Sequence, residues 1–216
     1  MSDSGLTKTG SSADNDPVPV VYIVDDMEQV QDIIFLILKN EGIRAEKFSS
    51  GETFLAQEEI SEIGCLVLDN QMPGMSGLAV QGELRKRNCH IPILFISGDS
   101  RYSDVVDAVR EGAFHFLQKP FTRSELLSRV REAIEESKDR QARLSHSKKF
   151  EDLLAALTTR EKEVYQLVTS GKTNKVIADS LGISNGTVEF HRANMMKKLD
   201  ANSLADLMEI SRGLGR

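Results

Sequence analysis

Cysteine is scarce in this chain. Of its 216 residues only Cys65 and Cys89 are cysteines, and neither a CxxC pair nor a Cys/His cluster occurs. Two cysteines are too few for a disulfide framework. The scarcity predicts a protein of a reduced, cytoplasmic compartment.

Long apolar runs are also missing. The longest run covers residues 33–38, far short of the roughly 20 residues that a membrane-spanning helix needs, so we expect no membrane partner. Residues 1–16 are rich in Ser, Gly, Thr and Asp and contain no apolar core of a signal peptide. We therefore expect residues 1–17 to form a disordered tail.

The composition is that of a globular protein with an uneven charge. Hydrophobic residues make up 40% of the chain and charged residues 28%, with a net charge of −6. From Ala155 onward Lys and Arg slightly outnumber Asp and Glu, by nine to seven, so the negative charge resides in the preceding part. This asymmetry indicates two parts with different partners, the second of them a nucleic acid.

Short apolar runs alternate with helical patterns through the first part of the chain. The predicted strands are residues 20–24, 44–48, 65–69, 91–96 and 113–118. The predicted helices cover 28–40, a short segment after a capping box at 49–52, 77–88, 101–111, and a segment that starts at the capping box 122–125 and runs beyond 140. Five strands that alternate with five helices predict an α/β fold, a flavodoxin-like doubly wound five-stranded parallel sheet.

The remaining chain is predicted to be all-helical. Apolar periodicity fades from Ser137 to Lys149, which predicts a helical linker at 138–154 between a domain at 18–137 and another at 155–216. Within the second domain, a capping box at 158–161 opens one helix, and helices at 174–181 and 185–199 are joined by a tight turn that contains Gly182. This is the helix-turn-helix pattern. A last helix is expected at 203–211.

Three acids stand at the ends of two predicted strands. Asp25 and Asp26 follow the first strand, and Asp69 ends the third. The carboxyl ends of parallel strands meet at one edge of the sheet, where such folds bind ligands. Crowded carboxylates repel one another, and Mg²⁺ is the cation that suits one or two carboxylates, waters and a phosphate.

Two further strand ends complete a pocket. Ser97 follows the fourth strand and Lys119 the fifth, which adds a hydroxyl donor and a cation. This set fits a carboxylate that accepts a phosphoryl group. Asp69 is the expected nucleophile because it stands alone on the central strand.

Each of these residues also has an ordinary structural interpretation. An Asp at a strand end commonly serves a turn, Ser97 can cap the next helix, and Lys119 can be a solvated loop residue. Phe116, an apolar residue of the fifth predicted strand, can likewise be an ordinary core residue. The joint occurrence of the strand-end residues favours the pocket.

At these motifs, residues 18–137 resemble the receiver domain of two-component response regulators. The matching residues are Asp25-Asp26, Asp69 followed by Met72-Pro73 and Gly77, Ser97-Gly98, and Lys119-Pro120-Phe121. The resemblance implies that a histidine kinase phosphorylates Asp69, and that Asp26, Asp69 and the main-chain carbonyl of Gln71 hold Mg²⁺ while Asp25 acts mainly through water.

The resemblance also implies a switch pair, Ser97 and Phe116. Many receivers carry Tyr where Phe116 stands, so the switch is expected to work by packing rather than by a phenolic hydrogen bond.

The second domain is similar to the LuxR-type helix-turn-helix, and the whole layout to the FixJ/NarL subfamily of response regulators. The matching residues are Leu157-Thr158, Arg160-Glu161, Gly171, Asn174-Lys175, Ile177-Ala178, Leu181, Ile183-Ser184, Thr187-Val188, His191, Asn194 and Lys198-Leu199. The similarity implies a double-stranded DNA operator as partner, with residues 185–199 as the recognition helix and Ser184 as its N-cap.

Candidate DNA contacts lie on both helices of the motif. They are Asn174, Lys175, Thr187, Glu189, Arg192, Asn194, Lys197 and Lys198. Arg192 is suited to guanine or a phosphate, Glu189 to the cytosine amine, and the lysines to phosphates. The alternative is that these charged residues simply form the solvent-exposed face of the helix, which would give the same charge pattern.

The basic surplus is small, so DNA affinity should depend on pairing of two copies. We expect a homodimer on activation, formed through Leu204, Leu207 and Met208 of the last helix, on an operator with two half-sites. RNA polymerase is a further expected partner. The predicted protein is a phosphorylation-controlled transcription factor and not an enzyme.

Two alternatives differ in chemistry. A Mg²⁺-dependent phosphatase or phosphotransferase would turn over through an aspartyl phosphate, but haloacid-dehalogenase-like enzymes carry Asp-x-Asp on one strand, and here Asn70 and Gln71 follow Asp69. A receiver-type regulator that never takes phosphate is the other alternative, and the complete pocket set disfavours it.

Overall fold

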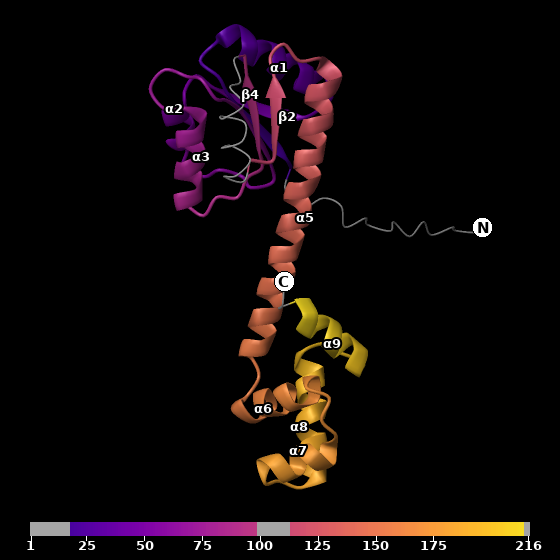
Figure 1. Ribbon diagram of the computed structural model, residues 1–216. Coiled ribbons are helices and arrows are strands. Elements are labelled where there is room, and N and C mark those ends of the chain that lie inside the picture. Colours follow the sequence, from indigo (N-terminus) through magenta and orange to yellow (C-terminus); the bar gives the residue numbers. More distant parts are fainter. Residues whose placement is uncertain (1–17, 99–112, 214–216) are drawn as a thin grey trace, which may run out of the picture. The chain divides into compact units, whose positions relative to one another are not determined.

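The computed structural model of the chain describes residues 18–98 and 113–213 (Figure 1). The predicted tail at 1–17 and the predicted helix at 101–111 lie outside these residues. The chain divides into two compact units, residues 1–141 and 142–216.

A five-stranded parallel sheet forms the first unit. Its strands are β1 (Val20–Val24), β2 (Arg44–Phe48), β3 (Gly64–Asp69), β4 (Ile93–Ser97) and β5 (His115–Gln118), in the order β2-β1-β3-β4-β5. All four pairings are parallel. This order is that of the flavodoxin-like doubly wound fold, which confirms the predicted fold class.

Helices cover both faces of this sheet. They are α1 (Glu28–Asn40), α2 (Gly51–Leu55), α3 (Gly77–Lys86) and α5 (Arg123–Ala155). Buried residues of α2 and α3 pack on one face with Tyr22 and Phe95, and those of α1 and α5 pack on the other with Ile23 and Ile96. The strands between the edges, β1, β3 and β4, are buried along their whole length, as expected of strands covered on both sides.

Several boundaries differ from the sequence prediction for local reasons. β4 begins at Ile93 rather than residue 91, because Pro92 has no amide hydrogen for the ladder. The cap of α2 is Ser50, whose partner in the capping box is Thr53, so the predicted box at 49–52 was one residue too early. The predicted boxes at 122–125 and 158–161 are present.

The second unit is helical. It contains the last part of α5, followed by α6 (Thr159–Thr169), α7 (Asn174–Leu181), α8 (Asn185–Lys198) and α9 (Leu204–Gly213). Its core includes Val164, Ile177, Val188 and Met195. Phe150 of α5 is also buried in this core, so part of the segment predicted as linker packs as a component of the second unit.

None of the described helices is both long and apolar enough to span a bilayer.

Candidate phosphoacceptor site and DNA-binding helices

Four strand ends build a polar pocket at the carboxyl edge of the sheet. Asp25 directly follows β1, Asp69 ends β3, Ser97 ends β4, and Lys119 directly follows β5. Lys119 Nζ donates to Asp25 Oδ2 at 2.7 Å and to Asp69 Oδ1 at 3.0 Å. The structure thus brings together three of the residues that the sequence predicted as one site.

The ion cluster of Asp25, Asp69 and Lys119 is largely removed from water, which shifts the pKa values of Asp69 and Lys119. The Asp25 and Asp69 side chains are 0% and 6% exposed, and that of Lys119 is 21% exposed. Burial raises the pKa of Asp69, and the hydrogen bond from Lys119 only partly opposes this shift. Burial by itself would lower the pKa of Lys119, but the two carboxylates more than offset it and raise this pKa. One ammonium therefore serves two buried acids, with a third acid, Asp26, exposed beside them.

The oxygen atoms of the described residues at this edge of the sheet are suited to Mg²⁺, although they do not surround a metal ion on all sides. Within residues 18–98 and 113–213, no cluster of at least three His, Cys, Asp or Glu is arranged to hold a metal ion. Mg²⁺ does not need such a cluster, because it keeps several waters and binds through one or two carboxylates plus a phosphate. Asp26, Asp69 and the Gln71 carbonyl are compatible with that requirement, and the cluster's excess negative charge favours a cation.

Two buried polar atoms at this edge have no hydrogen-bond partner among the described residues. They are Ser97 Oγ and Asn70 Oδ1, and the two residues are 1% and 8% exposed. A buried polar atom without a partner is destabilising by about 1–3 kcal/mol. Such an atom needs a functional explanation, and a phosphoryl oxygen would be a partner for the Ser97 hydroxyl.

Backbone contacts hold the acids in place. Asp25 Oδ1 accepts from the Met27 amide at 2.9 Å, and Asp69 Oδ2 accepts from the Gln71 amide at 3.1 Å. Gln31 Nε2 donates to the Asp25 carbonyl at 2.5 Å and to the Phe48 carbonyl at 3.3 Å. Gln31 was missed in the sequence, where the available signal was an amide on the otherwise apolar inner face of α1.

The loop after Asp69 requires a glycine at its end. A Cβ atom at Gly77 would lie 2.6 Å from the Asp69 carbonyl oxygen and 2.9 Å from Phe95 Cε1. No real Cβ sits that close, so Gly77 permits α3 to begin directly against the phosphoacceptor strand.

Phe116, the predicted switch ring, lies on β5. It pairs with Phe95 of β4 and is half-buried against the core that α2 and α3 cover. The role of Phe116 as a switch residue stays a prediction.

One face of α8 is buried in the core of the second unit. Val188, Met195 and Leu199 are buried at 0%, 0% and 1% exposure. Ser184 caps α8, because its hydroxyl accepts from the Thr187 amide at 3.1 Å. Gly182 has a φ of 65° at the turn, a conformation that glycine adopts easily.

The predicted DNA contacts fall into two groups. Lys175, Glu189 and Lys197 are exposed, while Thr187 and Asn194 are half-buried. Arg192 Nη1 donates to Asn174 Oδ1 at 2.6 Å, which braces α8 against α7.

Lys198 is also engaged within the unit. Its Nζ donates to Glu161 Oε2 at 2.7 Å, and this bond lowers the pKa of Glu161. Lys198 therefore has a structural partner in addition to its predicted phosphate contact.

The predicted dimer residues of α9 do not share one surface. Leu204 is 49% exposed, whereas Leu207 is 0% exposed and belongs to the core of the second unit. The prediction that Leu207 forms part of a pairing surface was wrong, because α9 uses it to close its own domain. Met208 is half-buried.

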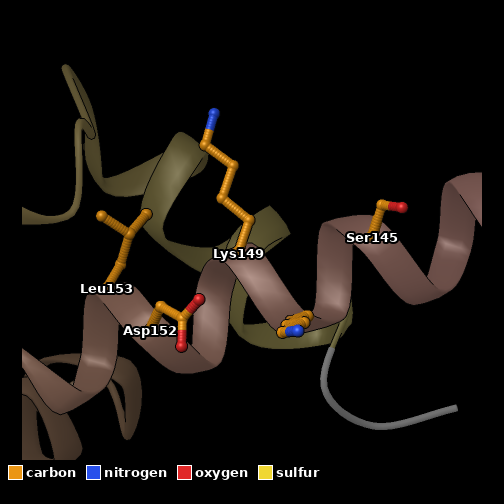
Figure 2. A pocket seen from close by; sticks show the side chains of 5 residues that line it. Ser145, Lys149, Asp152 and Leu153 are labelled. Atoms are coloured by element: carbon orange, nitrogen blue, oxygen red, sulfur yellow. The ribbon is translucent and has the colours of Figure 1, made fainter.

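A separate hollow lies along α5. Its lining residues are Ser145, Lys148, Lys149, Asp152 and Leu153, all from this one helix, and Figure 2 labels Ser145, Lys149, Asp152 and Leu153. None of them is a predicted site residue.

Two family models match the chain. The one described as "Response regulator receiver domain" covers residues 21–131, and the one described as "Bacterial regulatory proteins, luxR family" covers residues 155–211. Together they account for both compact units.

Curated relatives match over nearly the whole length. Response regulator protein TodT of Pseudomonas putida F1 is 36% identical over 207 residues, 96% of this chain and 91% of the relative. Nodulation protein W of Bradyrhizobium diazoefficiens is 37% identical over 196 residues, 91% of this chain and 86% of the relative. Transcriptional regulatory protein FixJ of Azorhizobium caulinodans is 32% identical over 191 residues, 88% and 90% of the two chains.

Solved structures also match most of the chain. The response regulator StyR has a TM-score of 0.82 at 37% identity, and the match covers 99% of StyR and 91% of this chain. Full-length FixJ from B. japonicum has a TM-score of 0.57 at 30% identity, and the match covers 97% of FixJ and 91% of this chain.

Fold, pocket and helix-turn-helix together define a receiver joined to a DNA-binding domain. The chain belongs to the response regulators with a LuxR-type helix-turn-helix, the class that contains FixJ. It regulates transcription within a two-component system, with a histidine kinase and DNA as its partners.

Proposed function

We propose that Asp69 is the phosphoacceptor, and that its phosphorylation controls dimerisation and DNA binding. The observation that carries the assignment is the bridging of buried Asp25 and Asp69 by Lys119, with the hydroxyl of buried Ser97, which has no partner in the described part of the chain, on the neighbouring strand end. Two buried acids, a partly buried cation and a hydroxyl without a partner among the described residues form a site prepared for a phosphoryl group.

The transfer step can be written at the level of bonds. A carboxylate oxygen of Asp69 attacks the phosphorus of the kinase's phosphohistidine, an O–P bond forms, and the bond between phosphorus and the imidazole nitrogen breaks. The electron pair stays on that nitrogen, which takes up a proton. Lys119 and Ser97 then contact phosphoryl oxygens, which satisfies the Ser97 hydroxyl.

Asp26, Asp69 and the Gln71 carbonyl would hold Mg²⁺. When bound, the ion neutralises charge on the phosphoryl oxygens. Asp25 is fully buried and bonded to Lys119, which supports a role mainly through that lysine and water.

The output follows from the movement of Ser97. As its hydroxyl turns toward the phosphoryl group, Phe116 packs more deeply and alters the face on which receivers pair. Pairing raises the effective concentration of one α8 helix near a second half-site. Leu204 and Met208 support pairing of the second unit, and RNA polymerase is the proposed downstream partner.

The test compares phosphoryl uptake with oligomeric state and DNA binding. The full chain is treated with acetyl phosphate and Mg²⁺, and intact mass, light-scattering mass and gel-shift affinity are measured on one sample. The unaltered protein is expected to gain one phosphoryl group, dimerise and bind DNA more tightly. Asp69→Asn is expected to do none of these.

A matched control uses an exposed acid of the same unit. Asp32 on α1 is 59% exposed and pairs with Lys47, so Asp32→Asn should behave like the unaltered chain. Uptake by Asp69→Asn at the rate of the unaltered chain would refute the assignment. Footprinting should protect two half-sites about one helical turn apart, and protection of a single half-site would refute the dimer.

A further inference from the structure

Phe190 is a large apolar side chain left in water on the recognition helix. It is 63% exposed, against 50% for Leu144, 49% for Leu204 and 43% for Val176. It is thus the most exposed large hydrophobic residue in the described part of the second unit.

The geometry of α8 places Phe190 opposite the core. Val188, Met195 and Leu199 form the inner face, and at about 100° per residue Phe190 lies on the far side of the helix. The residues that share its outward line, three or four positions apart, are Gly186, Ala193 and Lys197, all exposed.

The nearest neighbours of Phe190 on that line, Gly186 and Ala193, are too small to cover its ring. A Cβ atom at Gly186 would meet nothing closer than Ser184 Oγ at 3.9 Å, and Ala193 carries only a methyl group. The ring also rests edge-on against His191, with centroids 5.7 Å apart and an interplanar angle of 66°. Phe190 is therefore a positioned aromatic group between small residues.

The chemistry of the partner follows from this position. On the assumption of the proposed function, the outward line of α8 faces the major groove, where the apolar group on the base edges is the C5 methyl of thymine. We propose that Phe190 is a specificity-determining residue that reads thymine methyl groups in each half-site. Glu189 and Lys197 flank it with polar contacts, which confines the apolar readout to the ring.

The experiment removes the methyl group from DNA. A duplex is enriched from a random-sequence pool with the phosphorylated full-length protein, and each thymine of its half-sites is replaced in turn by uracil. Loss of a methyl group that the ring covers is expected to weaken binding roughly fourfold. Phe190→Ala should bind thymine and uracil duplexes equally, and Phe190→Leu should keep part of the preference.

Lys197→Ala is the matched control on the same line of α8. It should weaken binding to thymine and uracil duplexes by the same factor, since a phosphate contact does not sense the methyl group. Circular dichroism checks that each variant is folded. The uracil scan with the unaltered protein decides the question even if Phe190→Ala fails to fold.

The outcomes separate the two proposals. If phosphorylation-dependent binding is intact but no uracil substitution matters, the role of Phe190 is refuted and the proposed function stands. If Phe190→Ala keeps the thymine preference but loses transcription, the ring contacts another protein and the inference is overturned. If phosphorylation leaves DNA affinity unchanged, the proposed function itself fails.

Discussion

The phosphoacceptor pocket and the recognition helix handle charge in opposite ways. In the pocket, Asp25 and Asp69 are removed from water and share one ammonium, that of Lys119. On α8, Glu189 and Lys197 stay exposed. Buried charges interact strongly because solvent does not screen them, whereas exposed charges are weakened by salt.

This difference suits the two tasks. A change of state at one carboxylate must alter packing, so it occurs where the surrounding groups are buried and coupled. DNA must find and leave its site, so its contacts are solvated and add up over several phosphates. The comparison predicts that single substitutions in the pocket have large effects and those on α8 have small ones.

The largest effect is expected from loss of the shared ammonium. Lys119→Met leaves two buried carboxylates facing each other without a cation, which should lower the free energy of unfolding by about 3 kcal/mol and prevent phosphoryl uptake. Urea unfolding and intact mass measure the two effects.

Two controls sharpen this prediction. Lys47→Met removes a surface pair with Asp32 at 2.6 Å, which should change stability by less than about 1 kcal/mol. The double variant Lys119→Met with Asp25→Asn should regain stability, because one of the repelling charges is gone. Equal losses for Lys119→Met and Lys47→Met would contradict the buried-cluster interpretation.

A smaller effect is expected at the loop after Asp69. Gly77→Ala forces a methyl group to within 2.6 Å of the Asp69 carbonyl oxygen, and overpacking of this kind costs about 1–3 kcal/mol. It should also slow phosphorylation by acetyl phosphate, because the loop that carries Gln71 must shift.

Gly82 on the same helix provides the comparison. A Cβ atom there meets nothing within 4 Å, so Gly82→Ala should stabilise α3 by about 0.5–1 kcal/mol. Thermal unfolding distinguishes the two variants by sign. A stabilising Gly77→Ala would show that the close approach is not needed.

The smallest effects should distinguish two adjacent lysines. The Lys197 side chain forms no hydrogen bond or ion pair within the described part of the chain, while Lys198 Nζ donates to Glu161 Oε2 at 2.7 Å. Lys197→Ala should therefore reduce the salt dependence of DNA binding by about one phosphate contact. Lys198→Ala should mainly lower the stability of the second unit.

Binding titrations at several salt concentrations and thermal melts measure both lysine variants. The Glu161–Lys198 bond adds a pH test of the same idea. Because the folded pKa of Glu161 is depressed below 4.5, its stabilisation is present above that value and is lost as the pH falls through the folded pKa. Lys198→Ala should flatten this acid dependence. An unchanged profile would place Lys198 with the DNA contacts alone.

Local signals predicted most of the fold. α1, β2 and α7 have the predicted bounds, and Ser184 and Thr158 cap the predicted helices. Such features depend on residues within one turn of each other, so they can be read along the chain. The parallel sheet followed from the alternation of strands and helices.

The sequence predicted which residues belong to the site, but not which atoms they contact. The acids, Ser97 and Lys119 were recognisable as strand-end residues, yet the role of Gln31 was missed because its partners, the carbonyls of Asp25 and Phe48, are brought to it by the fold. The inward position of Leu207 was missed for the same reason, since α9 looks amphipathic whichever surface it covers.

The sequence by itself therefore determined which strands, helices and caps form, and which residues stand at the carboxyl edge of the sheet. Only the tertiary structure decided that Lys119 bridges Asp25 to Asp69, that Arg192 is held by Asn174, and that Phe190 stays exposed on the side of α8 opposite the core. The physical reason is range. Caps and periodicity act between near neighbours, whereas burial and ion pairing depend on residues that meet only after the chain has folded.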